Sequence, residues 1–213
     1  MAAKVLDASN DFLGVSDVHF WKVIKDDADG YEGGEVMVLS PTAEVSQTTE
    51  QSQTTVHYSN IPAYVVSSKG ATTISAILQG LALKVLAILE GNDLDTATGA
   101  LIDDGDSKNI YFGVSFRADY IPATDGARYY SFPKVNISIP DEATKTKGDG
   151  TDTLNQTVTI TAVSTRFKFE KNGKTCKRIA VDTINSGELL DLSKWFDQPV
   201  TPDSLAEILK AAG

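Results

Sequence analysis

The stretch from residue 41 to residue 79 limits what this chain can fold into more than any other part of it. Thr, Ser, Gln and Val dominate the stretch, and it contains almost no basic residues. Small, uncharged side chains that favour β-structure predict a sheet that is exposed to water or contacts another copy of the same chain, without binding tightly to either. The pattern indicates a lining or a lattice contact rather than a catalytic pocket.

The first half of the chain is predicted to consist mostly of strands. β-branched and aromatic residues indicate strands at Val18–Lys25, Glu35–Leu39, Thr42–Thr49, Thr54–Tyr58, Ala63–Ser67 and Thr72–Leu78. A loop at Glu50–Gln53 and a turn at Ser68–Gly70 separate the polar strands, so that a long polar hairpin spans residues 41–60. Leu81–Glu90 is apolar on nearly every side, which predicts a short helix buried all round and closed by Gly91.

The second half repeats the β pattern. Apolar and polar residues alternate at 110–117 and at 154–162, and Tyr129–Ile139 is predicted to be a strand that is either demoted to an edge strand or bulged at Pro133. Arg166–Arg178 is predicted to form a hairpin around a type I′ turn at Asn172-Gly173. Thr201 as N-cap and Pro202 at N1 begin a short amphipathic helix, whose apolar positions are Leu205, Ile208, Leu209 and Ala212.

These elements predict a mostly β fold, a β-sandwich or barrel with one short buried helix and a short C-terminal helix. The length of 213 residues suits one well-buried domain. We expect that domain to cover residues 1–199, with a helical extension at residues 200–213.

The charge of the chain is unevenly distributed. The net charge is −10, and the part up to Asp106 contains 16 acidic and 5 basic residues. From Ser107 onward there are 13 acidic and 14 basic residues. An acidic half repels a nucleic-acid backbone and a nearly neutral half attracts it weakly, which argues against a DNA-binding module.

The sequence contains no nucleophile elbow, phosphate loop, zinc spacing or dinucleotide fingerprint. The single cysteine, Cys176, forms no soft-metal motif with His19 and His57. The acidic run from Asp93 to Asp106 departs from the calcium-loop spacing, because Gly99 lies one place too late and Asp104 stands at the position of the final Glu. We expect neither an enzyme nor a cofactor or metal.

Nothing in the sequence predicts export or membrane insertion. Met1–Phe12 lacks an apolar core of signal-peptide length. The longest apolar run, Ala76–Leu89, is interrupted by polar residues and is too short to span a bilayer. We expect a soluble protein, made in the cytoplasm, with no membrane partner.

Several segments resemble, in their order, the major tail proteins of long-tailed phages of Gram-positive bacteria. The loop Thr144-Lys145-Thr146-Lys147-Gly148-Asp149 followed by the strand Leu154–Ala162 resembles a loop and strand found late in that family. Polar strands at Thr54–Ser59 with Asn60, the strand Thr72–Leu78 leading into a helix closed by Leu89-Glu90-Gly91, the aromatic strand Tyr111–Phe116, and Trp195-Phe196-Asp197 agree with the family order. The resemblance spans about Val18–Pro199.

The resemblance implies a tail-tube subunit located in the virion. Such subunits form homo-hexameric rings that stack into a hollow tube, through which double-stranded DNA passes without specific binding. Further partners implied are a tape-measure protein and tail-terminator or tail-tip proteins. A self-pairing sheet fits this independently, because strands paired between copies leave no exposed edge, and head-to-tail stacking yields an open filament.

Three groups of candidate functional residues follow. The period of two along the strand Thr42–Glu50 predicts a lumen-facing row at Glu44, Ser46, Thr48 and Glu50. The loop 141–152, with Thr144, Lys145, Thr146, Lys147, Gly148 and Asp149, is predicted to contact a neighbouring subunit. The hairpin Arg166–Arg178 is predicted to offer the cations Lys168, Lys171, Lys174 and Lys177 to the acidic half of the next subunit.

Two other classes of protein stay open. A carbohydrate-binding or adhesin β-module on a virion or cell surface is the main alternative, and it would usually show exposed Trp or Tyr platforms. Trp21 and Trp195 both lie in apolar settings, which does not favour it. An enzyme without a recognisable motif is the third class.

Overall fold

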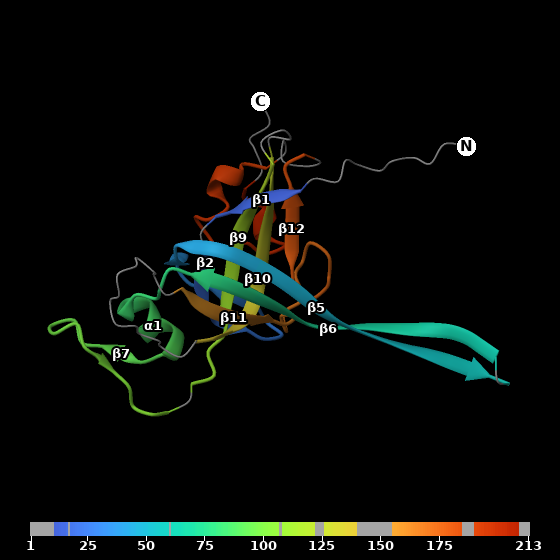
Figure 1. Cartoon of the computed structure of the whole chain (residues 1–213), viewed down its shortest axis with the longest axis horizontal. Helices are drawn as coiled ribbons and strands as arrows, with labels where there is room; N and C mark the ends of the chain where they lie inside the picture. Colours follow the sequence, from blue (N-terminus) through green and yellow to red (C-terminus); the bar gives the residue numbers. More distant parts are fainter. Residues whose placement is uncertain are drawn as a thin grey trace, which may run out of the picture.

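The computed structural model describes residues 11–16, 18–59, 61–106, 108–121, 126–139, 155–184 and 190–208. It confirms a mostly β fold built on one large antiparallel sheet (Figure 1). The strands are β1 (Phe12–Val15), β2 (Val18–Asp26), β3 (Tyr31–Gly33), β4 (Met37–Ser40), β5 (Thr42–Tyr58), β6 (Ile61–Leu78), β7 (Asp93–Leu94), β8 (Leu101–Ile102), β9 (Phe112–Tyr120), β10 (Ala127–Ser138), β11 (Gln156–Ala162) and β12 (Ile179–Asp182). The helical elements are α1 (Leu83–Glu90) and two short 3-10 turns, η1 (Leu192–Lys194) and η2 (Ser204–Ala206).

The strands β9 and β10 run through the whole body, and each pairs with two successive strands along one edge. β9 pairs with β1 at one end and with β2 at the other. β10 pairs in the same way with β12 and β11. The main path of the sheet is β3-β2-β9-β10-β11-β6-β5, and β7 and β8 form a separate hairpin. The ladder between β9 and β10 shifts register between Phe132 and Val135, as expected at Pro133, which has no N–H to donate.

Two apolar clusters form the core, and β10 contributes to both. Tyr130 and Phe132 point into the larger cluster, which also holds the alternating residues of β11 that the sequence predicted: Val158, Ile160 and Ala162. Ala127 and Tyr129 point the other way, into a smaller cluster with Trp195, Val200 and Ile208. The segment after Pro199 is therefore packed on the body as far as it is described.

In the C-terminal segment, Thr201 caps the chain as predicted, but the predicted α-helix does not follow it within the described residues. Thr201 accepts a hydrogen bond from the Ser204 amide at 3.2 Å, and the Ser204 hydroxyl accepts one from the Thr201 amide at 2.8 Å. The turn that follows is a 3-10 turn at Ser204–Ala206 rather than an α-helix. Leu209 and Ala212 lie outside the described residues.

Helix α1 confirms the predicted position and its predicted end. Gly91 lies in the left-handed region with φ 72°, and its N–H bonds the Ala87 carbonyl. The expectation of a helix buried all round was wrong, because α1 rests against the sheet with one side only. Leu86, Ala87 and Leu89 are buried, whereas Leu83 is 52% exposed.

The predicted loop at Glu50–Gln53 and the predicted turn at Ser68–Gly70 were both wrong. β5 runs unbroken for 17 residues and β6 for 18, paired from Thr42↔Leu78 to Tyr58↔Ile61. The hairpin thus spans residues 42–78 rather than 41–60. Register shifts at Thr49/Gln51 and Val56/His57 absorb the irregularities. A ribbon that is wet on both faces accepts Gln, Ser and Thr, so the polarity that suggested loops is compatible with strand.

Substitution of Gly113 by alanine is expected to lower the free energy of unfolding by about 1 to 3 kcal/mol, because the added methyl group would overlap the buried ring of Trp21. That ring is held in place, since its Nε1 donates to Tyr31 Oη at 3.0 Å and Tyr31 Oη donates to the Pro133 carbonyl at 2.7 Å. Gly14→Ala is the control, because there an added Cβ would approach no atom closer than 3.6 Å. Equal denaturation midpoints for the two variants would contradict this packing.

Candidate assembly surface

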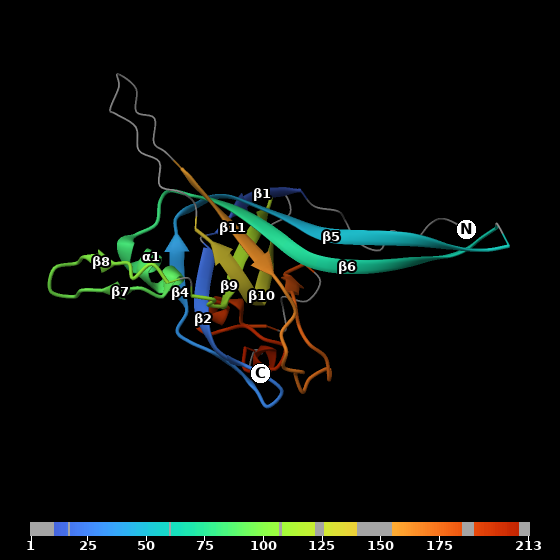
Figure 2. The same ribbon diagram turned by 90° about the horizontal axis from the view of Figure 1, so that it is seen from below.

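The two longest strands leave the body of the protein as a free ribbon, visible in both ribbon views (Figures 1 and 2). We call the part formed by residues 51–58 of β5 and 61–70 of β6 the arm. Every residue of the arm is exposed except Val56, which is half-buried. At about 3.4 Å per residue the arm extends roughly 27 Å along β5.

The outer edges of the arm are unpaired in the described structure. β5 pairs only with β6 along its whole length, and β11 pairs with β6 only between Thr72 and Leu78. Free strand edges carry rows of N–H and C=O groups that can pair with another chain. Pro62 removes one donor near the tip, which limits indiscriminate pairing there.

The two faces of the arm differ in polarity. Residues directly opposite one another share a face, and the pairs Thr54↔Val66 and Val56↔Tyr64 lie on one of them. The Tyr58 ring lies 6.2 Å from the Tyr64 ring and continues this apolar face towards the tip. The opposite face alternates with it and carries mainly polar pairs: Gln51↔Lys69, Gln53↔Ser67 and Thr55↔Val65.

The arm exposes more apolar surface than a solvated ribbon needs. Tyr58, Ile61, Tyr64 and Val66 are 51–67% exposed. A two-stranded ribbon without a packed face is at best marginally stable in water, and contiguous exposed apolar side chains mark interaction sites. The sequence contains a signal for this face. Large apolar residues stand two apart within polar surroundings, at Val56 and Tyr58 and again at Tyr64 and Val66. The prediction of polar strands did not take these positions into account.

Basic side chains gather where the arm joins the body. A pocket of about 390 Å³ there is lined by Thr49, Gln51, Lys69, Thr72, Lys177 and Arg178, and we call it the root pocket. Lys177 Nζ donates to the Gly70 carbonyl at 2.8 Å, which fixes residues 174–178 beside the ribbon. Gly70 lies beneath Glu50, and a Cβ at this position would come within 2.6 Å of the Glu50 carboxylate.

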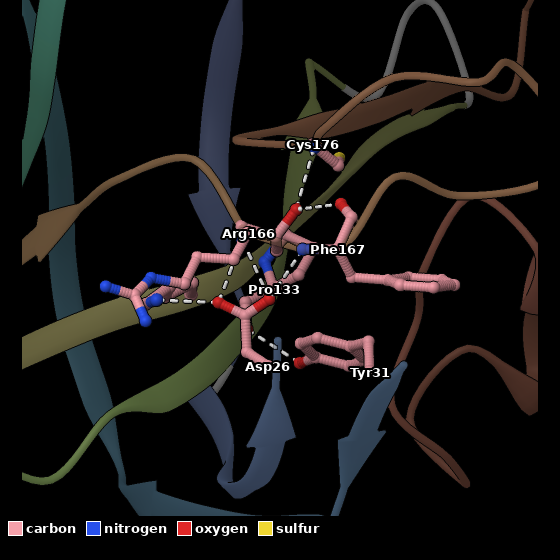
Figure 3. Close-up of polar contacts among 8 residues, drawn as sticks. Asp26, Tyr31, Pro133, Arg166, Phe167 and Cys176 are labelled. Carbon is pink, nitrogen blue, oxygen red and sulfur yellow. Dashed lines mark hydrogen bonds and ion pairs between the residues drawn. The ribbon is translucent and has the colours of Figure 1, made fainter. Parts of the chain in front are cut away.

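Lys177 lies near the end of the basic segment 166–178, and a buried carboxylate, that of Asp26, holds the start of this segment against the sheet (Figure 3). Asp26, at the end of β2, accepts hydrogen bonds from the Arg166 amide at 2.8 Å and the Phe167 amide at 3.0 Å. Its other oxygen pairs with Lys134 Nζ on β10 at 2.6 Å, and the two side chains are 4% and 10% exposed. Asp26 thus ties β2, β10 and the turn after β11 together.

The Asp26 carboxylate is fully engaged, which suits a structural role better than proton transfer. Burial raises the pKa of Asp26, but the Lys134 ammonium and the Phe167 and Arg166 amides outweigh burial and leave the pKa below its ordinary value. Cys176 lies close by and bonds Thr165 through its amide at 3.0 Å. Burial raises the pKa of the Cys176 thiol to about 11, so the thiol stays protonated at neutral pH.

The structure places the predicted lumen row on the outer face of β5. Glu44, Ser46, Thr48 and Glu50 are exposed, whereas Val45, Gln47 and Thr49 are half-buried on the core side. Ala43 is exposed rather than turned to the core, because the ladder shifts register between Thr42 and Glu44. That this row lines a lumen stays a prediction.

The predicted basic hairpin differs from its expected geometry. Only Gly173 has a positive φ, at 62°, so Asn172-Gly173 is not a type I′ turn, which needs two such residues. A single bridge, Phe169↔Lys174, closes a wider turn. Lys168, Lys171 and Lys174 are exposed, and only Lys177 reaches the ribbon. The predicted contact loop 141–152, with Thr144, Lys145, Thr146, Lys147, Gly148 and Asp149, lies outside the described residues.

The acidic run from Asp93 to Asp106, which departs from calcium-loop spacing, forms the hairpin β7–β8 and the segment after it. Asp95 accepts from the Ala97 amide within the hairpin turn, and Asp104 pairs with Lys108 at 2.8 Å. No group of His, Cys, Asp or Glu among the described residues is arranged to hold a metal ion. No helix within the described ranges is long and apolar enough to cross a membrane.

Comparison with known proteins gives little beyond this geometry. No protein-family model matches the chain, and no curated protein matches it. The chain is similar to one chain of a cryo-EM structure of the anti-feeding prophage baseplate, six-fold symmetrised, with 8% identity over 82% of this chain and 97% of that one. The TM-score of 0.33 does not establish a shared fold, so this likeness carries no information about function.

Proposed function

We propose that this chain is a structural virion protein, the tail-tube subunit of a long-tailed phage of Gram-positive bacteria. Copies of it associate into hexameric rings, and the rings stack into a tube that conducts the genome. The observation that carries the proposal is the arm, a ribbon with two unpaired edges and an exposed apolar face. The order of segments that resembles the major tail proteins supports the particular assembly.

The arm is suited to an assembly because the arms of two copies can pair their free edges and cover each other's apolar faces. Pairing its edges with a neighbour would satisfy the free backbone groups, and burying the face with Tyr58, Tyr64 and Val66 would remove apolar surface from water. About 25 cal/mol is gained per Å² of apolar surface buried. In this proposal the acids and hydroxyls of Glu44, Ser46 and Thr48 face the passing DNA and do not bind it.

The proposal assigns no catalysis and no cofactor to the chain. Its partners are further copies of itself, a tape-measure protein, and tail-terminator or tail-tip proteins. Its location is the virion.

The alternative of a carbohydrate-binding or adhesin module has less support in the site. Trp21 and Trp195 are fully buried and form no platform. Tyr58 and Tyr64 are exposed, but their rings are inclined at 45° to each other and do not form a flat stacking surface.

Electron microscopy of the purified chain tests the proposal. Negatively stained samples at increasing protein concentration are expected to show rings of six subunits and stacked tubes. Monomers at every concentration that bind to a glycan array would support the adhesin alternative. Monomers that bind no glycan would contradict both.

A further inference from the structure

The root pocket is a concentration of positive charge in an acidic chain. The chain has a net charge of −10, yet Lys69, Lys177 and Arg178 line one pocket, and the Glu50 carboxylate, which lies over Gly70 beside it, is not among the lining residues. None of the three cations forms an ion pair with a residue in the described ranges. The exposed Gln51 on its rim adds an amide group that can donate to a carboxylate, whereas the Thr49 and Thr72 hydroxyls bond each other at 2.9 Å.

A surface of opposite sign lies away from the root pocket, at the end of the long axis opposite the tip of the arm (Figures 1 and 2). We call residues 93–106, which comprise β7, β8 and the following segment, the acidic lobe. Asp93 and Asp106 are exposed there and accept no hydrogen bond from a described residue through their side chains. Ile102, on the same lobe, is 59% exposed and offers an apolar contact.

The two surfaces cannot neutralise each other within one chain. The acidic lobe lies at one end of the long axis, and the strands that line the root pocket lie where the arm leaves the body, in both ribbon views (Figures 1 and 2). A contact between different surfaces of identical copies repeats from copy to copy, because each copy keeps one unused surface of each sign.

We propose, on the basis of the self-assembly proposed above, that the root pocket of one copy receives the acidic lobe of a second copy. Complementary charge steers the encounter and sets the register of the copies. The exposed lysines of the turn at Phe169–Lys174 fit this role less well. The Asp203 carboxylate accepts from the Glu170 and Lys171 amides at 3.1 and 2.9 Å, so a negative charge already lies at that turn.

Two charge-reversed variants test the contact without removing either surface. Variant one carries Lys69→Glu and Arg178→Glu, which makes the charge of the pocket net negative. Variant two carries Asp93→Lys, Thr96→Lys, Ala100→Lys and Asp106→Lys, which makes the charge of the lobe net positive, because only Asp95, Asp103 and Asp104 remain there. These side chains are exposed or line the pocket and lie outside the hydrogen bonds that hold Lys177 and Asp104, and thermal unfolding that matches the parent verifies the fold. Each variant alone is expected to assemble at least about tenfold more slowly than the parent at low salt.

Mixing the two variants in equal amounts gives the decisive result. The acidic pocket of variant one then meets the basic lobe of variant two, and the basic pocket of variant two meets the acidic lobe of variant one. Light scattering is expected to show that assembly is restored only in the mixture. Added salt should reduce the difference in assembly rate between the mixture and each variant alone.

Other outcomes separate this contact from the assembly itself. If the parent assembles but the variants match it, or the mixture stays inactive, the pocket is not the partner of the lobe. If Lys171→Glu with Lys174→Glu slows assembly and variant one does not, the exposed turn is the contact instead. If the parent never assembles, the proposed function fails and this contact fails with it.

Discussion

Replacing Asp26 by alanine is expected to lower the free energy of unfolding by about 3 to 5 kcal/mol, the usual cost of leaving one partner of a buried ion pair unpaired. The substitution leaves Lys134 without its carboxylate and the Arg166 and Phe167 amides without their acceptor. For a chain of this size the melting temperature should fall by roughly 6 to 20 °C. Thermal and urea denaturation measure the change.

Asp29→Ala is the control, because Asp29 is an exposed carboxylate of the same turn and should change stability by no more than about 0.5 kcal/mol. A second variant, Asp26→Asn with Lys134→Met, should lose less than the sum of the two single substitutions, because it leaves no buried charge alone. Equal stability of Asp26→Ala and Asp29→Ala would refute the structural role of Asp26.

The Asp26 carboxylate makes the free energy of unfolding depend on pH in the acidic range. The pKa of Asp26 is lower in the folded chain than its ordinary value. Its contribution is therefore fully present above the unfolded pKa of about 3.9 and is lost as the pH falls through the folded pKa. The stability difference between the parent and Asp26→Asn should accordingly shrink below about pH 4.

The sequence predicted the parts of this fold that depend on local patterns. Val158, Ile160 and Ala162 are buried in alternation, the ladder is irregular at Pro133, and Gly91 ends the helix. Each of these follows from the conformational limits of one residue or from the period of one strand.

Features that depend on distant partners could not be predicted in this way. Asp26 lies 108 residues from Lys134 and 140 from Arg166, so no spacing in the sequence links them. The continuity of β5 through Glu50–Gln53 depends on its pairing with β6, not on its own composition. The turn at Asn172-Gly173 departs from type I′ because residues Phe169 and Lys174 are the ones that pair.

Shortening the arm is expected to abolish assembly and to leave the body nearly as stable as before. Residues 54–66 are replaced by Asn-Gly, a two-residue type I′ turn joining the opposed pair Gln53↔Ser67. Because the removed side chains that the structure describes are exposed or half-buried, the free energy of unfolding should change by less than about 1 kcal/mol. The root pocket keeps all of its lining residues.

A milder pair of variants separates the two faces of the arm. Tyr64→Thr with Val66→Thr keeps β-favouring residues but removes two large apolar side chains from the apolar face, and should weaken assembly strongly. Val65→Thr on the opposite face is the matched control and should assemble like the parent. Normal assembly of both variants would show that the arm acts through its backbone edges alone, and equal loss in both would contradict the difference between its two faces.

Sedimentation velocity of the parent chain and of the chain with the shortened arm, run side by side over the same concentrations, tests the role of the arm most directly. The parent is expected to move into ring-sized and larger species as concentration rises, while the shortened chain sediments as a folded monomer of about 21.5 kDa, a little below the 22.8 kDa of the parent. Large species from the shortened chain, formed at the parent's concentrations, would contradict the assignment of the arm as the element that joins the copies.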